Sequence, residues 1–519
     1  MPTNVKENGF ESSIVSWLVQ HNGYEQGSNA DYNKEIAMDE TRLFRFLNTT
    51  QADKMKQLRL ENDPLEKEKF LQRLDQSLHT NGVIDLLRKG FRYKHLVLDM
   101  FYVRPSPGNE TAAKLYAQNI FSVTRQLQYS RQNPLLALDV CLFLNGLPIA
   151  TMELKNQLTK QNAADAVKQY KDERTPDEVL FGFKRCIVHF AVDDNEVRMC
   201  TELKGQKSWF LPFNKGYNDG AGNPPNPDGI KTDYLWKEIL RKDDFSNIIE
   251  NYVQIICDED EETHKKSYKQ IFPRYHQLQL VTSLLADAKR DGVGKRYLIQ
   301  HSAGSGKSNS IAWLAHQLVT LKDATDHNIF DTVIVVTDRV NLDKQIRNTI
   351  RQFMQVSSTV GWAKDSSELG TLLEKGTKII ITIVHKFQFI LEDISKLHTN
   401  RSFAILIDEA HSSQNGDLST KMNIVLSGSE YDNDDLLEDK INTLIDGKKL
   451  AKNASYFAFT ATPKNKTLEV FGREEIQPDG SKRFFPHYVY TMKQAIEEHF
   501  IMDVLRYYTC LLYTSDAAD

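Results

Sequence analysis

The sequence of 519 residues is poor in cysteine and lacks a long apolar run. Its five cysteines are scattered without a CxxC pair, which excludes a disulfide framework and a cysteine-rich zinc site. No apolar stretch approaches the roughly 20 residues that cross a bilayer. The first residues lack a basic segment followed by an apolar one, so no secretion signal is expected. These absences predict a cytoplasmic protein with no membrane partner.

The sequence also lacks an excess of charge of one sign. Lys and Arg number 65 against 70 Asp and Glu, which gives a net charge of −5. This balance excludes a uniformly basic nucleic-acid coat, but phosphates respond to local patches rather than to the total. Basic residues gather within 265–274 and 289–296, where a solvated surface and a DNA contact remain open alternatives.

Hydrophobic patterning divides the chain into several segments. Leucine spacing predicts helices within 40–80, and short β-branched and aromatic runs predict strands between 93 and 200. A Gly/Pro/Asn-rich stretch (214–229) predicts an ordered surface loop, and the acidic run 257–262 a domain boundary. The chain is long enough for two or three domains.

The second half has a different pattern. Uniformly apolar runs alternate with helix-length segments, and such strands are typical of a parallel sheet covered on both faces. The runs are RYLIQ (296–300), TVIVVT (332–337), KIIITIV (378–384), FAILID (403–408) and YFAFTAT (456–462). They predict a doubly wound α/β domain whose ligand lies at the carboxyl ends of the strands.

A phosphate-binding loop is predicted at HSAGSGKS (301–308), between a strand and a helix. Glycines let the backbone approach phosphate, and the loop N–H groups with the helix N-terminus attract the anion. The lysine would reach the β- and γ-phosphates of ATP, and the last serine would bind Mg²⁺. His301 replaces the first glycine of the usual pattern. The residues expected to bind nucleotide are Gly304, Ser305, Gly306, Lys307 and Ser308.

Two further motifs follow at strand ends. DEAH (408–411) offers Asp408 to hold Mg²⁺ through water and Glu409 to orient and deprotonate the attacking water. TAT (460–462) closes the last apolar run, and with the other motifs it resembles superfamily 2 helicases. That resemblance implies that Thr460, Thr462 and His411 couple nucleotide state to movement on nucleic acid.

The helicase resemblance includes three other segments. PRYHQ (273–277) looks like the adenine-reading segment of these motors, with Gln277 contacting adenine. TDRVNLDKQI (337–346) and TIVHKF (382–387) resemble segments that touch the DNA backbone. For Arg339, Gln345, His385 and Lys386, DNA contact and plain surface placement remain open alternatives.

A second candidate site lies upstream, in LDVCLFLNGLPIATMELKNQ (138–157). Glu153 and Lys155 are two apart and share one face of a strand. With Asp139 from the neighbouring strand they form the D…ExK pattern of PD-(D/E)xK nucleases. The two carboxylates would bind Mg²⁺, and the lysine would stabilise charge on the scissile phosphate or help activate water.

The D…ExK site requires a particular register between the two strands that carry it. Asn145-Gly146 predicts a two-residue hairpin turn, whose ideal register pairs Asp139 with Met152. Glu153 would then lie on the opposite face. A working site therefore requires a one-residue offset, and we expect a bulge at Pro148, which cannot donate to the ladder.

Over nearly its whole length the chain resembles the restriction (R) subunits of type I restriction enzymes. FESSIVSWLVQHNGY (10–24) looks like their opening helix, in which Glu11 joins the acidic cluster. LPIATMELKNQ (147–157) looks like their metal-binding strand. QNAADAVKQYKDE (161–173) looks like their Q-x-x-x-Y helix, but Ala166 occupies the glutamine position. Gln169 and Tyr170 are candidates for DNA contact or for packing on the sheet.

The resemblance predicts four segments. Residues 1–255 form a mixed-sheet PD-(D/E)xK endonuclease domain, and residues 263–490 a first RecA-like ATP-binding motor lobe. Residues 491–508 begin the bridge to a second lobe that this sequence does not contain. Residues 509–519 do not continue the family pattern and are interpreted as a sequencing or assembly artefact. Because the second lobe supplies arginine fingers, we expect this chain to hydrolyse ATP poorly.

The function implied is ATP-dependent translocation on double-stranded DNA coupled to Mg²⁺-dependent cleavage of both strands. The resemblance also implies two partners, a methylation (M) subunit and a specificity (S) subunit. An alternative is a superfamily 2 DNA repair or remodelling helicase whose N-terminal domain is an inert DNA-binding module. A third is a scaffold that only binds nucleotide. Glu409 argues against the scaffold, because a pure binder does not need a carboxylate that positions water.

Overall fold

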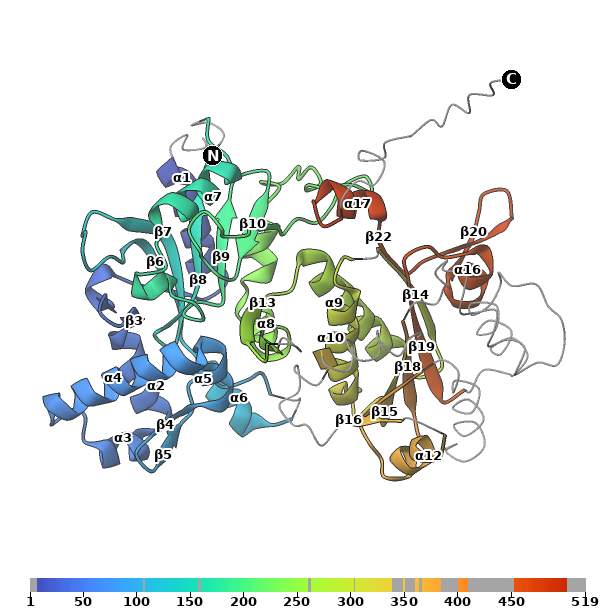
Figure 1. Cartoon of the computed structure of the whole chain (residues 1–519), viewed down its shortest axis with the longest axis horizontal. Helices are drawn as coiled ribbons and strands as arrows, with labels where there is room; N and C mark the ends of the chain where they lie inside the picture. Colours follow the sequence, from blue (N-terminus) through green and yellow to red (C-terminus); the bar gives the residue numbers. More distant parts are fainter. Residues whose placement is uncertain are drawn as a thin grey trace, which may run out of the picture.

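The computed structural model describes residues 7–105, 108–156, 160–259, 263–302, 304–337, 349–350, 360–363, 366–383, 400–408 and 452–501. This part of the chain contains two seven-stranded sheets, the first within residues 25–212 and the second within residues 296–490. Figure 1 shows them in two bodies that lie side by side. The mixed α/β class is confirmed. No helix among the described residues is both long and apolar enough to cross a membrane.

Helices dominate the region before the first sheet, as the leucine spacing predicts. Leu43, Phe46 and Leu47 are buried along one helix face, and the side chains of Asp39 and Asp63 cap the N-termini of two helices. The helices are α1 (Glu7–Gln20), α2 (Glu40–Thr50), α3 (Ala52–Leu58), α4 (Pro64–Asn81), α5 (Val83–Lys89) and α6 (Glu110–Ala117), with the short pairs β2 (Tyr32–Asn33), β3 (Met38–Asp39) and β4 (Phe91–Tyr93), β5 (Leu96–Leu98).

The first sheet is mixed and has the strand order β1-β6-β7-β8-β9-β10-β11. Strand pairs β1–β6 and β8–β9 are parallel, and the others are antiparallel. The strands are β1 (Glu25–Gln26), β6 (Phe121–Gln128), β7 (Ala137–Leu144), β8 (Leu147–Leu154), β9 (Val188–Val192), β10 (Val197–Cys200) and β11 (Leu211–Pro212).

Helices cover both faces of this sheet. Val140 and Leu142 of β7 belong to the core that includes α1, while Cys141 and Phe143 belong to the core that includes α7 (Ala163–Glu173). Side chains alternate between the faces of a strand. Asp139 therefore shares the α7 face with Cys141, and every residue of β8 is buried.

The hairpin of β7 and β8 contains the predicted offset. Leu144 pairs with Leu147 and Phe143 with Pro148, but Leu142 then pairs with Ala150 and Val140 with Met152. Ile149 is the extra residue, directly after Pro148. Both turn residues have positive φ, 50° at Asn145 and 83° at Gly146, as the expected turn requires. The bulge is confirmed, and it places Glu153 opposite Asp139 on one face.

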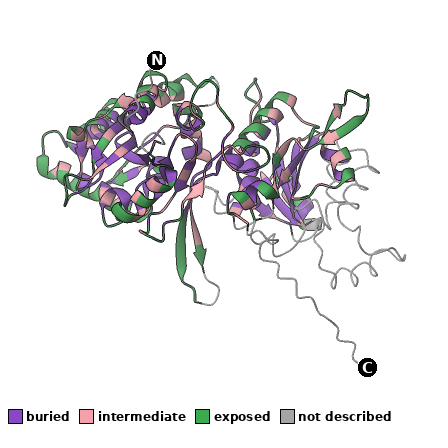
Figure 2. Cartoon of the chain, turned by 90° about the horizontal axis from the view of Figure 1, so that it is seen from above, coloured by how far each residue is buried: buried purple, intermediate pink, exposed green. Residues whose placement is uncertain are grey.

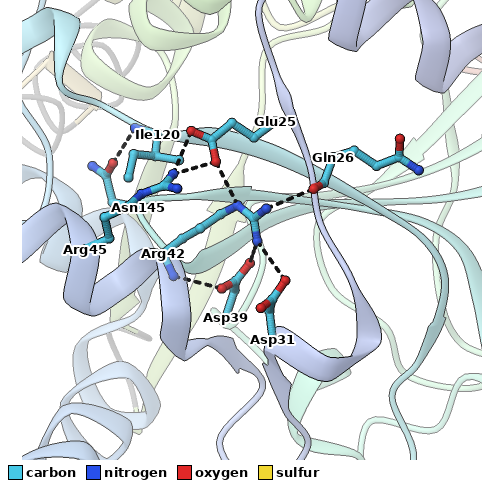
Figure 3. Close-up of polar contacts among 8 residues, drawn as sticks. All are labelled: Glu25, Gln26, Asp31, Asp39, Arg42, Arg45, Ile120 and Asn145. Carbon is cyan, nitrogen blue, oxygen red and sulfur yellow. Dashed lines mark hydrogen bonds and ion pairs between the residues drawn. The ribbon is translucent and has the colours of Figure 1, made fainter.

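A buried arginine fixes the turn end of this hairpin (Figure 3). Arg42 of α2 is 7% exposed and donates to Asp39, Asp31, Glu25 and the carbonyl of Gln26. The backbone N–H of Asp39 in turn donates to the carbonyl of Gly146, at 2.9 Å. These neighbouring carboxylates raise the pKa of Arg42 against the effect of burial. The offset follows this anchored turn after two residue pairs.

The second sheet is parallel throughout, in the order β16-β17-β15-β18-β19-β14-β22. All five apolar runs predicted as strands are confirmed. The strands are β14 (Arg296–His301), β15 (Thr332–Thr337), β16 (Val360–Trp362), β17 (Ile379–Ile383), β18 (Phe403–Ile407), β19 (Ala454–Thr460) and β22 (Tyr488–Tyr490).

Helices cover both faces of this sheet too, which confirms the doubly wound architecture. Residues Ile299 and Val335 pack in the core that includes α9 (Tyr275–Asp291) and α10 (Lys307–Thr320). Leu298 and Val336 pack with α12 (Ser366–Glu374) and α16 (Asn465–Phe471). This alternation explains why the strands are apolar on both faces.

The predicted border between the domains falls inside a β-hairpin, β12 (Gln254–Glu259) and β13 (Lys266–Ile271). Figure 2 shows this hairpin projecting from the molecule with exposed strands. Its base is held by Gln270, whose Nε2 donates to the carbonyls of Cys186 and Ile187 at 2.7 and 2.8 Å. The domain limits stay a prediction, because core packing is continuous between the two bodies.

One contact between the two bodies involves the Gly/Pro/Asn-rich stretch. The 214–229 loop is ordered and irregular, as predicted, and it contacts α17 (Met492–Glu497). Thr491 donates to the carbonyl of Asp219 at 2.9 Å, and Ala221 N–H donates to Glu497 at 2.8 Å. The other elements are the short helices η1 (Asn29–Asp31), η3 (Val179–Phe181) and η4 (Leu235–Ile239), helix α8 (Lys242–Asn251), and strands β20 (Arg473–Ile476) and β21 (Lys482–Phe485).

Candidate functional site

Of the expected nuclease residues, Glu11, Asp139 and Lys155 line one pocket of about 420 Å³ between the first sheet and α7, and Glu153 is fully buried next to Asp139. Asp139 Oδ2 accepts from the backbone N–H of Leu154 at 2.8 Å, which fixes the carboxylate beside the end of β8. Lys155 also lines the pocket, and its own N–H donates to Val192 at 2.9 Å. The bulge thus brings Asp139, Glu153 and Lys155 together, as the sequence requires.

The pKa values of both carboxyl groups, Asp139 and Glu153, are raised. Glu153 is 0% exposed. Burial and then the neighbouring Asp139 raise its pKa, although Arg174 and Lys155 oppose the rise. Burial likewise raises the pKa of Asp139. An adjacent pair of acids, one buried and one partly buried, whose pKa values are both raised is the environment that a bound cation relieves.

Arg174 is a site residue that the sequence analysis missed. It is 2% exposed, and its Nε donates to Glu153 Oε1 at 2.6 Å. Its other nitrogens donate to Tyr129 Oη and to the carbonyl of Ala137, each at 2.9 Å. Glu153 is therefore held by one oxygen, while Oε2 is buried without a hydrogen-bond partner. No sequence pattern marks Arg174, which follows α7 by one residue.

Glu11 lines the same pocket, but its carboxylate oxygens already accept hydrogen bonds from other side chains. Its carboxylate accepts from Arg125 at 2.7 Å and from Gln126 at 2.9 Å. Gln126, also missed from the sequence, donates to Asp139 Oδ1 at 3.2 Å as well. Glu11 therefore reaches Asp139 through an amide rather than directly.

The two candidates on α7 have different environments. Gln169 lines the pocket, and its Oε1 is buried without a hydrogen-bond partner. Tyr170 is 0% exposed, and its hydroxyl bonds Thr151 at 2.8 Å. Of the two alternatives for Tyr170, the structure therefore supports packing on the sheet. DNA contact by Tyr170 is ruled out, because a buried ring cannot reach a phosphate.

The donor set fits Mg²⁺ only in part as it stands. Oxygen ligands are what Mg²⁺ prefers, and it retains several waters, so two carboxylates are enough. Glu153 Oε2 is an orphaned buried acceptor beside Asp139, which is consistent with such a ligand. Among the described residues, however, no group of three or more His, Cys, Asp or Glu side chains is placed to hold a metal ion.

The second site is the phosphate loop between β14 and α10. Gly304 and Gly306 have φ of 73° and 85°, a conformation that favours glycine. A Cβ at Gly306 would lie 2.6 Å from Gln277 Nε2, so the loop also lacks space there. Ser308 sits in the first turn of α10. Lys307 Nζ lies 3.2 Å from Asp408 Oδ1, which follows β18. The loop has the predicted strand-loop-helix setting.

The N-terminal end of α9, with its N-cap Arg274 and Gln277 in its first turn, holds this loop. Gln277 Nε2 donates to the carbonyl of Gly306 at 3.0 Å, and its Oε1 accepts from Arg274 N–H at 3.1 Å. Arg274 donates to the carbonyl of Ser305 and stacks on Phe500, 3.5 Å from its ring centre. Both ends of the Gln277 amide are thus used within the chain. Contact with adenine would require them to exchange partners.

His301 has a structural role in place of the usual glycine. It is 0% exposed, and its Nδ1 lies 2.7 Å from Ser305 Oγ while Nε2 lies 3.3 Å from Ser310 Oγ. Burial, with the nearby Arg274 and Lys307, lowers its pKa to about 3. The ring is therefore neutral and holds the loop through hydroxyl groups.

The remaining motor candidates are only partly described. Thr460 is buried at the end of β19, which lies between β14 and β18, and it accepts from Thr462 N–H at 3.3 Å. Thr462 is exposed. The other candidates lie outside the described residues: Glu409, His411, Arg339, Gln345, His385 and Lys386.

Two family models match the chain in tandem. Residues 4–208 match the type I restriction enzyme R protein N terminus, and residues 276–515 match the SWI2/SNF2 ATPase family. The sequence also resembles the HindI endonuclease subunit, from a type I restriction enzyme of Haemophilus influenzae, at 26% identity over 69% of this chain. A type I endonuclease subunit of Staphylococcus aureus (SauMSSORF170P) is 25% identical over 90% of this chain.

The chain spans only 33% and 45% of the lengths of these two relatives. A solved fragment assigned to an HsdR subunit from Vibrio vulnificus gives a TM-score of 0.28 at 15% identity, covering 70% of this chain and 51% of that one. The tandem order of the two family matches is the order expected from the motifs, a nuclease-like segment followed by an ATPase segment. With the curated relatives, these matches show that the chain is similar to type I restriction enzyme R proteins, with residues 4–208 matching the N terminus of that family.

Proposed function

We propose that this chain carries the nuclease site and the first motor lobe of a type I restriction endonuclease. In this proposal ATP-driven movement on double-stranded DNA is coupled to Mg²⁺-dependent cleavage of both strands. The observation that supports it most strongly is the bulge at Ile149, which places Asp139 and Glu153 on one face. A sheet that served only as a scaffold has no need of a buried acid next to a second, partly buried one.

In the nuclease site, Asp139 and Glu153 would hold Mg²⁺, which when bound polarises the scissile phosphate and activates water. The N–H of Leu154 and the side chain of Arg174 keep the two carboxylates in place. Lys155, at the pocket, would stabilise the negative charge that develops on the phosphate. Gln169 has a free acceptor at the same pocket and would orient water or substrate.

In the motor lobe, the loop N–H groups and the N-terminus of α10 would bind the phosphates of ATP. Lys307 would leave Asp408 and reach the β- and γ-phosphates, which frees Asp408 to hold Mg²⁺ through water with Ser308. Glu409 would position the attacking water, and Thr460, Thr462 and His411 would couple hydrolysis to movement.

The assignment to a type I system also predicts partners. A methylation subunit and a specificity subunit would complete the enzyme, and the specificity subunit would recognise the target sequence. The domain limits 1–255 and 263–490, with a bridge from 491, are part of this proposal.

Cleavage of a supercoiled plasmid by the chain in Mg²⁺, with EDTA as a blank, tests the nuclease site. We expect Glu153→Gln and Lys155→Met to lower the cleavage rate by roughly 10²–10³, the effect of removing one group that stabilises the transition state. Lys168→Met is the matched control, because Lys168 is exposed on α7 and does not line the pocket. ATP binding should be unchanged in all three.

Lys307→Ala provides the reciprocal test. It should abolish ATP binding, measured with a fluorescent ATP analogue, and leave plasmid cleavage by the isolated chain intact. Cleavage that persists in both Glu153→Gln and Lys155→Met would reject the nuclease assignment and favour the helicase with an inert N-terminal domain.

A further inference from the structure

A basic groove lies on the helical part of the N-terminal body, away from the nuclease pocket. Its volume is about 710 Å³, and α4, α5 and β4 form its walls. The groove is lined by Lys69, Arg73, Gln76, Ser77, Thr80, Asn81, Asp85, Leu86, Lys89, Gly90, Phe91, Arg92, Tyr93 and Lys94. None of these residues belongs to the motifs described above.

The charge of the groove is one-sided. Five cationic side chains line it against a single carboxylate, Asp85, on a chain whose net charge is −5. Lys89 pairs with Asp85 at 2.9 Å, and Lys94 contacts Glu66 at the edge. The other three cations, Lys69, Arg73 and Arg92, are exposed and form no ion pair with the described residues.

The polar residues of the groove follow one face of α4. Positions 69, 73, 76, 77 and 80 are three or four residues apart, so their side chains form one stripe. At 1.5 Å per residue this stripe is roughly 16 Å long. The cations, amides and hydroxyls of the stripe are the donors that contact phosphate oxygens in protein–DNA complexes.

The positive surface continues past the end of α4. The N–H of Val83 donates to the carbonyl of Lys184 at 3.0 Å, which places Lys184 beside the groove. Lys184 Nζ lies 4.5 Å from the ring centre of Tyr268 on the projecting hairpin, and that ring is 47% exposed. Lys184 and the partly exposed ring of Tyr268 therefore extend the groove as far as the hairpin, where Lys269 is already paired with Asp258 at 2.9 Å.

We propose that this groove binds the phosphate backbone of double-stranded DNA without regard to sequence. The inference rests on the proposed function, which makes DNA the substrate, and it names a contact surface apart from the nuclease and nucleotide sites. An acidic protein partner is the competing occupant. The groove sets five cations from α4, α5 and the β4 segment beside amide and hydroxyl donors and a single carboxylate, and such donors are the ones that contact a phosphate strand.

The test is fluorescence anisotropy of a labelled duplex of arbitrary sequence, titrated with the whole chain at several salt concentrations. Each phosphate contact contributes about 0.9 to the slope of log affinity against log salt. Replacing Lys69, Arg73 and Arg92 together by Gln should therefore lower that slope by up to about 2.7, with a matching loss of affinity at low salt.

The matched control replaces Lys204, Lys207 and Lys231 by Gln, which makes the same change in net charge at exposed positions outside the groove. It should leave the slope unchanged. If the groove variant and the control bind DNA with the same slope, the groove is not a DNA contact, and the proposed function stands without it. If the unmodified chain does not bind the duplex at low salt, the groove proposal and the DNA substrate are both rejected.

Discussion

The ion pair between Arg174 and Glu153 gives a sharp prediction about stability. Arg174→Met removes three hydrogen bonds, to Glu153, Tyr129 and Ala137, and leaves a carboxyl group that is 0% exposed without its cation. Breaking a buried ion pair from one side costs about 3–5 kcal/mol. For a cooperative unit of 150–250 residues that loss lowers the melting temperature by roughly 6–20 °C.

The control and the double variant make the prediction specific. Arg198→Met breaks a pair with Glu196 whose side chains are 35% and 31% exposed, and such pairs contribute about 0–1 kcal/mol. Adding Glu153→Gln to Arg174→Met removes the uncompensated acid and should recover part of the loss. Scanning calorimetry of the four proteins above pH 8 measures these effects, because burial and Asp139 raise the pKa of Glu153 to about 8 and the ion pair requires the ionised carboxylate. A melting temperature of Arg174→Met equal to that of Arg198→Met, or a double variant less stable than Arg174→Met, would refute the reasoning.

Three further predictions concern single side chains. His301→Gly restores the usual loop glycine, yet it should lower stability by about 2–5 kcal/mol because it empties a buried site; calorimetry would show this, and an unchanged melting temperature would contradict it. Gly306→Ala should weaken binding of a fluorescent ATP analogue at least tenfold, since its Cβ would meet Gln277 at 2.6 Å; equal affinity would argue against the loop geometry. The folded chain keeps a proton on Glu153 above pH 4.5, where the unfolded chain loses it, because its pKa is raised on folding. Stability from this group therefore falls as pH rises above 4.5, and Glu153→Gln should flatten the dependence of melting temperature on pH.

Much of the fold follows from local sequence features. The parallel sheet was predictable because strands that are buried on both faces must be apolar throughout, as in TVIVVT and FAILID. The β7–β8 offset was predictable from a conflict between two registers. The turn at Asn145-Gly146 pairs Asp139 with Met152, whereas the catalytic pattern requires Asp139 and Glu153 on the same face. Proline could not take part in a regular ladder, and the extra residue lies next to it.

Other features depend on contacts between distant parts of the chain. Arg174 meets Glu153 across 21 residues, and Gln126 joins Glu11 to Asp139 across 115 and 13. Sequence spacing carries no signal for such contacts. The domain border stays a prediction: the described part of the acidic run, 257–259, lies in β12, and that pairing with β13 was not visible from the sequence. Tyr170 fits a family pattern in sequence, whereas only its packing on the sheet shows that it is buried.

The central claim is that the bulge joins Asp139 and Glu153 into one cation site, and metal binding tests it directly. Titration of the chain with Mn²⁺ in the absence of nucleotide, followed by electron paramagnetic resonance, counts bound ions without relying on cleavage. We predict one site in the unmodified chain that is lost in both Asp139→Asn and Glu153→Gln and kept in Lys307→Ala. Equal Mn²⁺ binding by the unmodified chain and the two carboxylate variants would contradict the account.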